Sequence, residues 1–195
     1  KLKLRRVQEK ILDAYQKCRE ARKPVKIVVL KPRKFGATTI VQALSYHHLR
    51  YFGGRSGAVM GDIASTGSTC FDMFKGFAEN DKFNWPDGLG ALKIGDKENN
   101  LTDYISLPNK AIYRTVTAGS SNANRSGTLQ VAVMEEVAYY PTDGERDPAL
   151  GFLGSWTRDT ESSMACMIST PSGPSGTFFR YWSDDRNDWI KIFTA

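Results

Sequence analysis

Apolar residues recur along the chain with two periods, one typical of amphipathic helices and one typical of buried strands. Residues 1 to about 23 alternate cations with apolar residues at helical spacing, which predicts an amphipathic helix with a basic face. Short, mostly apolar runs predict buried strands at about 25–30, 58–63, 129–134 and 165–169. Further helices are predicted at about 38–51, 68–78, 150–156 and 177–183.

Weaker patterns complete this alternation. Residues 104–107 and 111–117 predict a strand pair joined by a turn, and residues 189–193 predict a last strand. Residues 66–68 are interpreted as the cap of the third helix, and residues 79–100 as a surface excursion with weak structure. Because helices alternate with buried strands throughout, we expect an α/β fold with a mainly parallel central sheet flanked by helices.

The composition fits one globular domain and narrows the functional classes. Of the 195 residues, 41% are hydrophobic and 25% are charged, and no apolar run has the length of a membrane span. The three cysteines, Cys18, Cys70 and Cys166, lack metal-ligand spacing and are typical of reduced thiols in a cytoplasmic protein. The net charge of +6 suits a polyanionic partner such as nucleic acid but does not by itself establish one. For the basic helix at residues 1–23, a solvated surface is an equally good interpretation.

The first buried strand runs directly into a cationic turn and then a helix. This turn, Lys31-Pro32-Arg33-Lys34-Phe35-Gly36-Ala37-Thr38-Thr39, has the context of a phosphate-binding loop. Against the pattern G-x-x-x-x-G-K-[ST], Gly36 and Thr38 match, but Lys31 replaces the first glycine and Ala37 replaces the lysine. The backbone N–H groups and the cations Lys31, Arg33 and Lys34 suit a polyphosphate, and the Thr38 hydroxyl suits Mg²⁺.

Two later strands end in residues that suit the same chemistry. Glu135 and Glu136 follow a buried strand, at the edge of an α/β sheet where ligands bind. Glu135 can complete the shell of a metal ion, and Glu136 can orient or activate a water molecule. Ser169 and Thr170 end a neighbouring strand, where they could sense a γ-phosphate. A structural salt-bridge cluster and an ordinary β-turn are the simpler interpretations of these two segments.

Three segments together resemble a known family. They are the loop 31–39, a deviant Walker A motif; Val131-Ala132-Val133-Met134-Glu135-Glu136 with Tyr140-Pro141, similar to Walker B; and Ser169-Thr170-Pro171-Ser172-Gly173 with Gly176, Phe178 and Trp182, similar to the coupling motif. In this order they resemble the ATPase domain of the large terminase subunit of tailed bacteriophages, the motor that packs DNA into procapsids. The resemblance covers nearly the whole chain and implies a P-loop fold of the additional-strand, catalytic-glutamate class.

The resemblance also implies roles for the loop and its surroundings. Lys31 would be a phosphate-binding lysine at the start of the loop, which explains how Ala37 is tolerated. Arg33 would act on the γ-phosphate within the same subunit, and Arg125 would reach into the neighbouring subunit's site. Gln8 would recognise adenine before the first strand.

The remaining implied roles concern the strand ends, the cofactors and the partners. Glu136 would be the catalytic glutamate and Thr170 part of the coupling motif, with ATP and Mg²⁺ as cofactors. The implied partners are double-stranded DNA, the portal or procapsid, the small terminase subunit and further copies in a homo-oligomeric ring, with no membrane. The implied location is the host cell cytoplasm and not the mature virion.

The expected organisation is a single ATPase domain over residues 1–195. Residues 1–23 form the basic helix that carries Gln8, and residues 24–195 form the P-loop core. The nuclease domain of the family is not expected within this chain, because no acidic metal cluster for it is evident.

Two departures from the family pattern leave alternatives open. Glu135 replaces the usual aspartate, and its longer side chain leaves open a contact with the metal through water. Lys34 competes with Lys31 for the lysine role. The alternatives are a helicase-like or other DNA-dependent P-loop ATPase, and a nucleotide-binding assembly module that does not hydrolyse ATP. Ala37 and Glu135 motivate the second of these.

Overall fold

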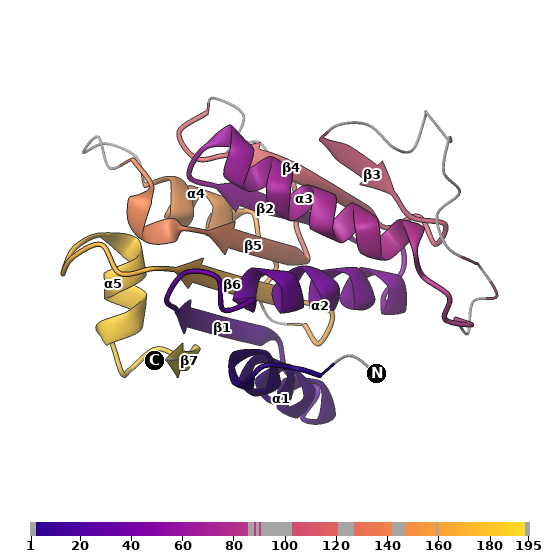
Figure 1. Ribbon diagram of the computed structural model, residues 1–195, viewed down its shortest axis with the longest axis horizontal. Coiled ribbons are helices and arrows are strands. Elements are labelled where there is room, and N and C mark those ends of the chain that lie inside the picture. The colour runs from indigo at the N-terminus through magenta and orange to yellow at the C-terminus, as the bar shows by residue number, and fades with distance from the viewer. Residues whose placement is uncertain are drawn as a thin grey trace.

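The computed structural model describes residues 3–85, 88, 90, 103–120, 127–141, 147–158 and 160–193. Helices and strands alternate along them (Figure 1). The elements in chain order are α1 Arg6–Glu20, β1 Val25–Leu30, α2 Ala37–Tyr51, β2 Ser56–Gly61, α3 Ala64–Glu79, β3 Tyr104–Ser106, β4 Ile112–Thr117, β5 Val131–Glu135, the 3-10 helix η1 Val137–Tyr139, α4 Pro148–Gly154, β6 Met164–Ser169, α5 Gly176–Ser183 and β7 Ile190–Phe193.

The strands form one sheet in the order β3-β4-β2-β5-β6-β1-β7. All neighbours are parallel except β3, which pairs antiparallel with β4 as the predicted strand pair requires. Strand β6 lies between β1, which leads into the loop at 31–36, and β5, which ends in Glu135. This intervening strand is the additional strand of the expected class, so the predicted fold class is confirmed.

Both faces of the sheet are covered, and the strand residues divide between the two cores by alternation. Helices α1, α2 and α3 cover one face, and α4, η1 and α5 lie on the other (Figure 1). In β1, for example, Ile27 and Val29 pack with the first set, whereas Val28 packs with the second. The carboxyl ends of the parallel strands therefore meet at one edge, shown on the left of Figure 1.

The third helix begins earlier than predicted. Helix α3 starts at Ala64 after an extended Ile63, so residues 66–68 lie within its first turns and cap nothing. The early start follows from a close approach of backbone, because a Cβ atom on Gly61 would lie 2.4 Å from the backbone nitrogen of Gly67. Only glycine at position 61 permits the helix to begin this close to the end of β2.

The expected surface excursion at 79–100 lies mostly outside the described residues. Its first part is held against α2, because the Asp81 carboxylate accepts hydrogen bonds from the Tyr46 hydroxyl (2.5 Å) and from the Trp85 indole N–H. Among the described residues, no helix is long and apolar enough to cross a membrane.

Candidate functional site

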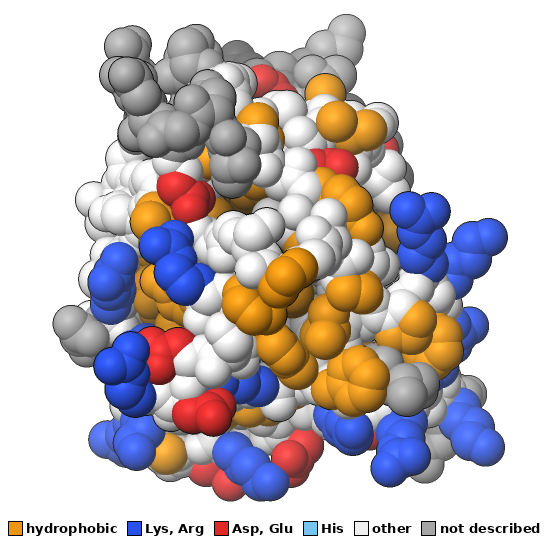
Figure 2. Space-filling view, turned by 90° about the vertical axis from the view of Figure 1, so that its left-hand side faces the viewer, with side chains coloured by type: hydrophobic (Ala, Val, Ile, Leu, Met, Phe, Trp, Pro, Cys, Tyr) orange, Lys and Arg blue, Asp and Glu red, His pale blue; other side chains and the backbone are white. Residues whose placement is uncertain are grey.

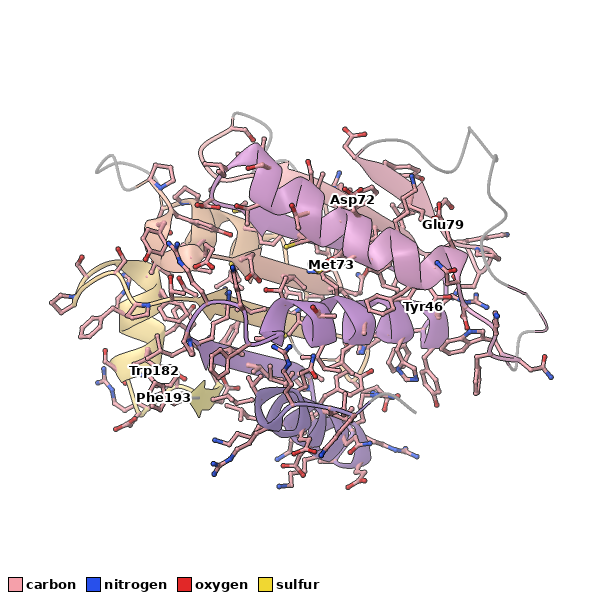
Figure 3. The ribbon with its side chains drawn as sticks, in the orientation of Figure 1. Tyr46, Asp72, Met73, Glu79, Trp182 and Phe193 are labelled. Carbon is pink, nitrogen blue, oxygen red and sulfur yellow. The ribbon has the colours of Figure 1, made fainter. Side chains whose placement is uncertain are left out.

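The loop after β1 closes on a left-handed glycine. Gly36 has φ +83° and is the N-cap of α2, and Lys34 also has a positive φ of +65°. A cavity of about 530 Å³ lies over this loop. It is lined by residues 34–39 together with Lys3, Arg5, Gln8, Lys31 and Met73. Met73 contributes from α3, from which it points towards α2 (Figure 3). The loop thus presents the helix N-terminus and its N–H groups to a cavity, as phosphate binding requires.

Lys31 is buried at the base of this loop and faces two carboxylates. Its side-chain Nζ lies 2.9 Å from Glu135 Oε1 and 3.1 Å from Glu136 Oε1. Burial disfavours the ammonium, but the attraction of Glu135 and then Glu136 outweighs it and raises the pKa of Lys31. Lys34 and Arg33, in contrast, are exposed. Of the two candidate lysines, Lys31 is therefore the one in contact with the acidic residues.

Glu135 is almost fully buried, with 3% of its surface exposed. Its Oε1 accepts a hydrogen bond of 2.6 Å from the Thr38 hydroxyl in addition to its contact with Lys31. Burial raises the pKa of Glu135 although Lys31 and Thr38 favour the carboxylate. Its second oxygen, Oε2, is buried and has no hydrogen-bond partner among the residues that the structure describes.

The arrangement of Thr38 and Glu135 fits a hydrated Mg²⁺ ion. Carboxylate and hydroxyl oxygens are its preferred ligands, and the orphaned Glu135 Oε2 is available for such a contact, direct or through water. No group of three or more His, Cys, Asp or Glu side chains among the described residues is arranged to hold a metal alone.

Glu136 occupies an unusual backbone conformation that turns its side chain into the site. Its φ of +57° is left-handed, and its backbone N–H donates to Ile168 O on β6 at 2.7 Å. Successive residues of a strand point to opposite faces. The left-handed turn breaks that alternation, and as a result the carboxylates of Glu135 and Glu136 both reach Lys31.

The Glu136 carboxylate is held at both oxygens. Oε1 contacts Lys31, and Oε2 accepts hydrogen bonds from the Thr170 backbone N–H (3.1 Å) and hydroxyl (3.2 Å). Burial opposes ionisation, but the Thr170 N–H and Lys31 lower the pKa of Glu136 below its ordinary value. Ser169 contributes next to it, since its Oγ accepts a hydrogen bond from the Ala138 N–H (3.1 Å) at the start of η1.

Gln8 lies against the loop from the side of α1. Its Oε1 accepts from the Arg5 N–H (2.9 Å), and its Nε2 donates to Gly36 O (3.2 Å). Arg5 adds a second link, from its guanidinium to Lys34 O at 2.8 Å. An amide group has two N–H donors and two lone pairs, so Gln8 retains one of each for the edge of a base.

Other residues predicted for the site differ in their exposure, and one lies outside the described residues. Phe35 is 39% exposed at the tip of the loop, while Ala37 is buried below it. Arg125 lies outside the described residues, so its predicted role stays a prediction. The carboxyl edge of the sheet carries apolar side chains near its centre with cations on its flanks (Figure 2).

Two residues near the site were not predicted from the sequence. Tyr139, the third residue after Glu136, bonds to Thr170, and only its spacing from the paired glutamates could have indicated it. Asp62 follows β2, the strand beside β5, and its buried Oδ1 has no partner within the described part of the chain. An acidic residue directly after a predicted strand was a usable signal for Asp62.

Solved structures with the same fold come from phage packaging proteins. The large terminase of a thermophilic bacteriophage matches with a TM-score of 0.70 and 13% identity over 98% of this chain and 46% of that one. The same terminase in complex with ADP matches with a TM-score of 0.66 and 14% identity, over 98% of this chain and 45% of that chain. This chain therefore spans less than half the length of those terminases.

This chain covers most of the length of one solved structure that consists of an ATPase domain alone. The ATPase domain of the Thermus phage P74-26 large terminase, in a mutant form, matches with a TM-score of 0.59 and 14% identity over 99% of this chain and 82% of that one. No protein-family model matches the sequence, and no curated protein does so either. The chain has the P-loop NTPase fold of the ATPase domains of phage large terminases.

Proposed function

We propose that this chain is the ATPase motor domain of a phage DNA-packaging machine, which hydrolyses ATP with Mg²⁺ to move double-stranded DNA into a procapsid. The observation that carries the proposal is the convergence of three strand ends. Lys31, after β1, lies within hydrogen-bond distance of Glu135 and Glu136 at the end of β5. Glu136 in turn accepts a hydrogen bond from the N–H of Thr170, after β6. Phosphoryl transfer requires this kind of positioning and neutralisation of charge.

In this proposal Lys31 exchanges partners when nucleotide binds. The N–H groups of the loop and the Lys31 ammonium hold the phosphates, and Arg33 approaches the γ-phosphate from the exposed side of the loop. Lys31 then leaves Glu136 Oε1, which becomes free to accept a hydrogen bond from the attacking water. Gln8 uses its remaining donor and acceptor on adenine, as the resemblance suggests.

The metal ion has a defined place in the same proposal. Thr38 and Glu135 would hold Mg²⁺ together with the phosphates. When bound, it neutralises negative charge that spreads over the phosphate oxygens. Glu135 Oε2, which has no hydrogen-bond partner among the described residues, would make this contact.

The partners and the location belong to the same proposal. The neighbouring structures are named as large terminases and as a DNA packaging motor, and one was solved with ADP. We extend to this chain the portal or procapsid and the small terminase subunit as partners, a homo-oligomeric ring in which Arg125 completes a neighbour's site, and the host cytoplasm as location. A single copy should consequently be a weak ATPase.

The test is phosphate release by the chain with Mg²⁺, DNA and procapsids. Wild type should release phosphate, and Glu136→Gln should abolish release while ADP still binds, because ADP lacks the phosphate that the glutamate serves. Glu161→Gln is the matched control, since Glu161 is an exposed glutamate. Full turnover by Glu136→Gln would refute the role of Glu136.

The same assay distinguishes the alternatives. Tight ATP binding without phosphate release, even with DNA and procapsids present, would favour the non-hydrolysing assembly module. Strand separation by the chain would favour the helicase-like ATPase over the packaging motor.

A further inference from the structure

Three hydroxyl and carboxyl groups form a continuous chain from Glu136 to the segment before α5. Glu136 Oε2 lies 3.2 Å from the Thr170 hydroxyl, which lies 3.1 Å from the Tyr139 hydroxyl. The Tyr139 hydroxyl in turn lies 3.2 Å from the backbone oxygen of Pro171. The chain therefore joins the carboxylate to residues 171–175, which lead directly into α5.

The number of protons limits how these contacts can be used. Thr170 and Tyr139 each carry one hydroxyl proton, and three contacts compete for those two protons. With Glu136 ionised, Thr170 donates to the carboxylate, and Tyr139 can donate to Thr170 or to Pro171. The contact between Tyr139 and Pro171 is therefore optional in this state, whereas the Thr170 bond to Glu136 is favoured by its charge.

We propose that Tyr139 is a positioning residue for Glu136, acting through Thr170. Its place supports this, because η1 carries Tyr139 immediately after Glu136 and packs against α5. Tyr139 is 45% exposed, so its ring can be changed without disturbing the core. The turnover arm of the test below rests on the proposed function; the spectroscopic arm does not.

The first experiment uses the free protein at neutral pH and needs no nucleotide. The carboxyl ¹³C signal of Glu136 is recorded in the wild type and in Tyr139→Phe, which keeps the ring. The signal should shift in Tyr139→Phe relative to wild type. In a Thr170→Val background, adding Tyr139→Phe should leave the signal where Thr170→Val alone puts it. In a Thr170→Ser background, which keeps a hydroxyl, adding Tyr139→Phe should shift the signal again. Tyr51→Phe, on an exposed tyrosine of α2, should leave it unchanged. The proposal is overturned if Tyr139→Phe leaves the Glu136 signal unchanged, or if Tyr139→Phe shifts it by the same amount when the Thr170 hydroxyl is absent.

The second experiment measures turnover. Tyr139→Phe should lower kcat about three- to tenfold, the effect of one hydrogen bond, with KM and ADP affinity unchanged. The loss should disappear in a Thr170→Val background, since the two residues act in series. An equal loss in both backgrounds, or a loss confined to KM, refutes a role through Thr170. Inactive wild-type protein would count against the proposed function and leave the carboxyl signal as the decisive result for Tyr139.

Discussion

Replacing Lys31 by methionine removes the single cation between two carboxylates. Lys31→Met keeps most of the side-chain length but deletes the contacts of 2.9 Å to Glu135 and 3.1 Å to Glu136. Removing one partner of a buried ion pair costs about 3–5 kcal/mol, because the other charge stays buried without compensation. For a domain of this size each kcal/mol lowers Tm by about 2–4 °C, so the expected loss is on the order of 10 °C.

The pH dependence of this loss follows from Glu135. Its pKa in the folded protein is already raised by burial, and loss of Lys31 raises it further. A group with a raised folded pKa contributes stability below its unfolded pKa of about 4.3 and loses that contribution as the pH rises through the folded value. The destabilisation by Lys31→Met should therefore be large at pH 8 and smaller at pH 5, where Glu135 can take up a proton.

The assay is urea unfolding of wild type, Lys31→Met and Lys34→Met at both pH values, followed by circular dichroism. Lys34 is exposed, so Lys34→Met should change the free energy of unfolding by no more than about 0.5 kcal/mol. In calorimetry, ADP binding should be lost only with Lys31→Met. Equal stability of the two variants, or a pH-independent loss, would refute the reasoning about charge, and lost binding in Lys34→Met alone would reassign the phosphate lysine.

Further predictions concern the loop and its neighbours. Gly36→Ala should lower the free energy of unfolding by about 1 kcal/mol because its backbone is left-handed, and by a further amount because the new Cβ atom would lie 2.8 Å from Gln8 Nε2. Gly54→Ala, at φ +71° with nothing within 4 Å of the new Cβ atom, is the control for the backbone effect alone. Equal losses in the two variants would contradict the contact with Gln8. Gln8→Ala should cost about 1 kcal/mol in thermal unfolding by freeing α1 from the loop, whereas exposed Gln16→Ala on the same helix should cost almost nothing. Because the pKa of Glu136 is lowered in the folded protein, its contribution to stability should be present above about pH 4.3 and should fall as the pH drops through the folded pKa. Glu136→Gln should therefore be less stable than wild type in urea at pH 7. A difference in stability that persists in acid would contradict this.

The sequence predicts much of the fold because its hydrophobic pattern is regular. The runs around β1, β5 and β6 are apolar on both faces, so their burial and parallel pairing follow from periodicity alone. The start of α3 was wrong by four residues, since polar hydroxyl residues suggested a cap where a close approach of Gly61 and Gly67 decides the boundary.

Site residues could be named from the sequence more readily than their contacts. The strand ends predicted that Glu136 and Thr170 lie near the loop, and in the structure Glu136 contacts both Thr170 and Lys31 at the start of the loop. The choice between Lys31 and Lys34 depends on burial, which spacing does not reveal. The role of Tyr139 depends on the direction of one hydroxyl group, and neither propensity nor periodicity carries that information.

The left-handed backbone of Glu136 sets stability against activity at one residue. A side chain in this conformation costs about 1–2 kcal/mol, a cost that glycine would not bear. Glu136→Gly would relieve the backbone and would also remove the carboxylate. Engineering that selects only for thermal tolerance should therefore tend to lose the acidic residue here, and a thermostable variant of this chain needs its gains elsewhere.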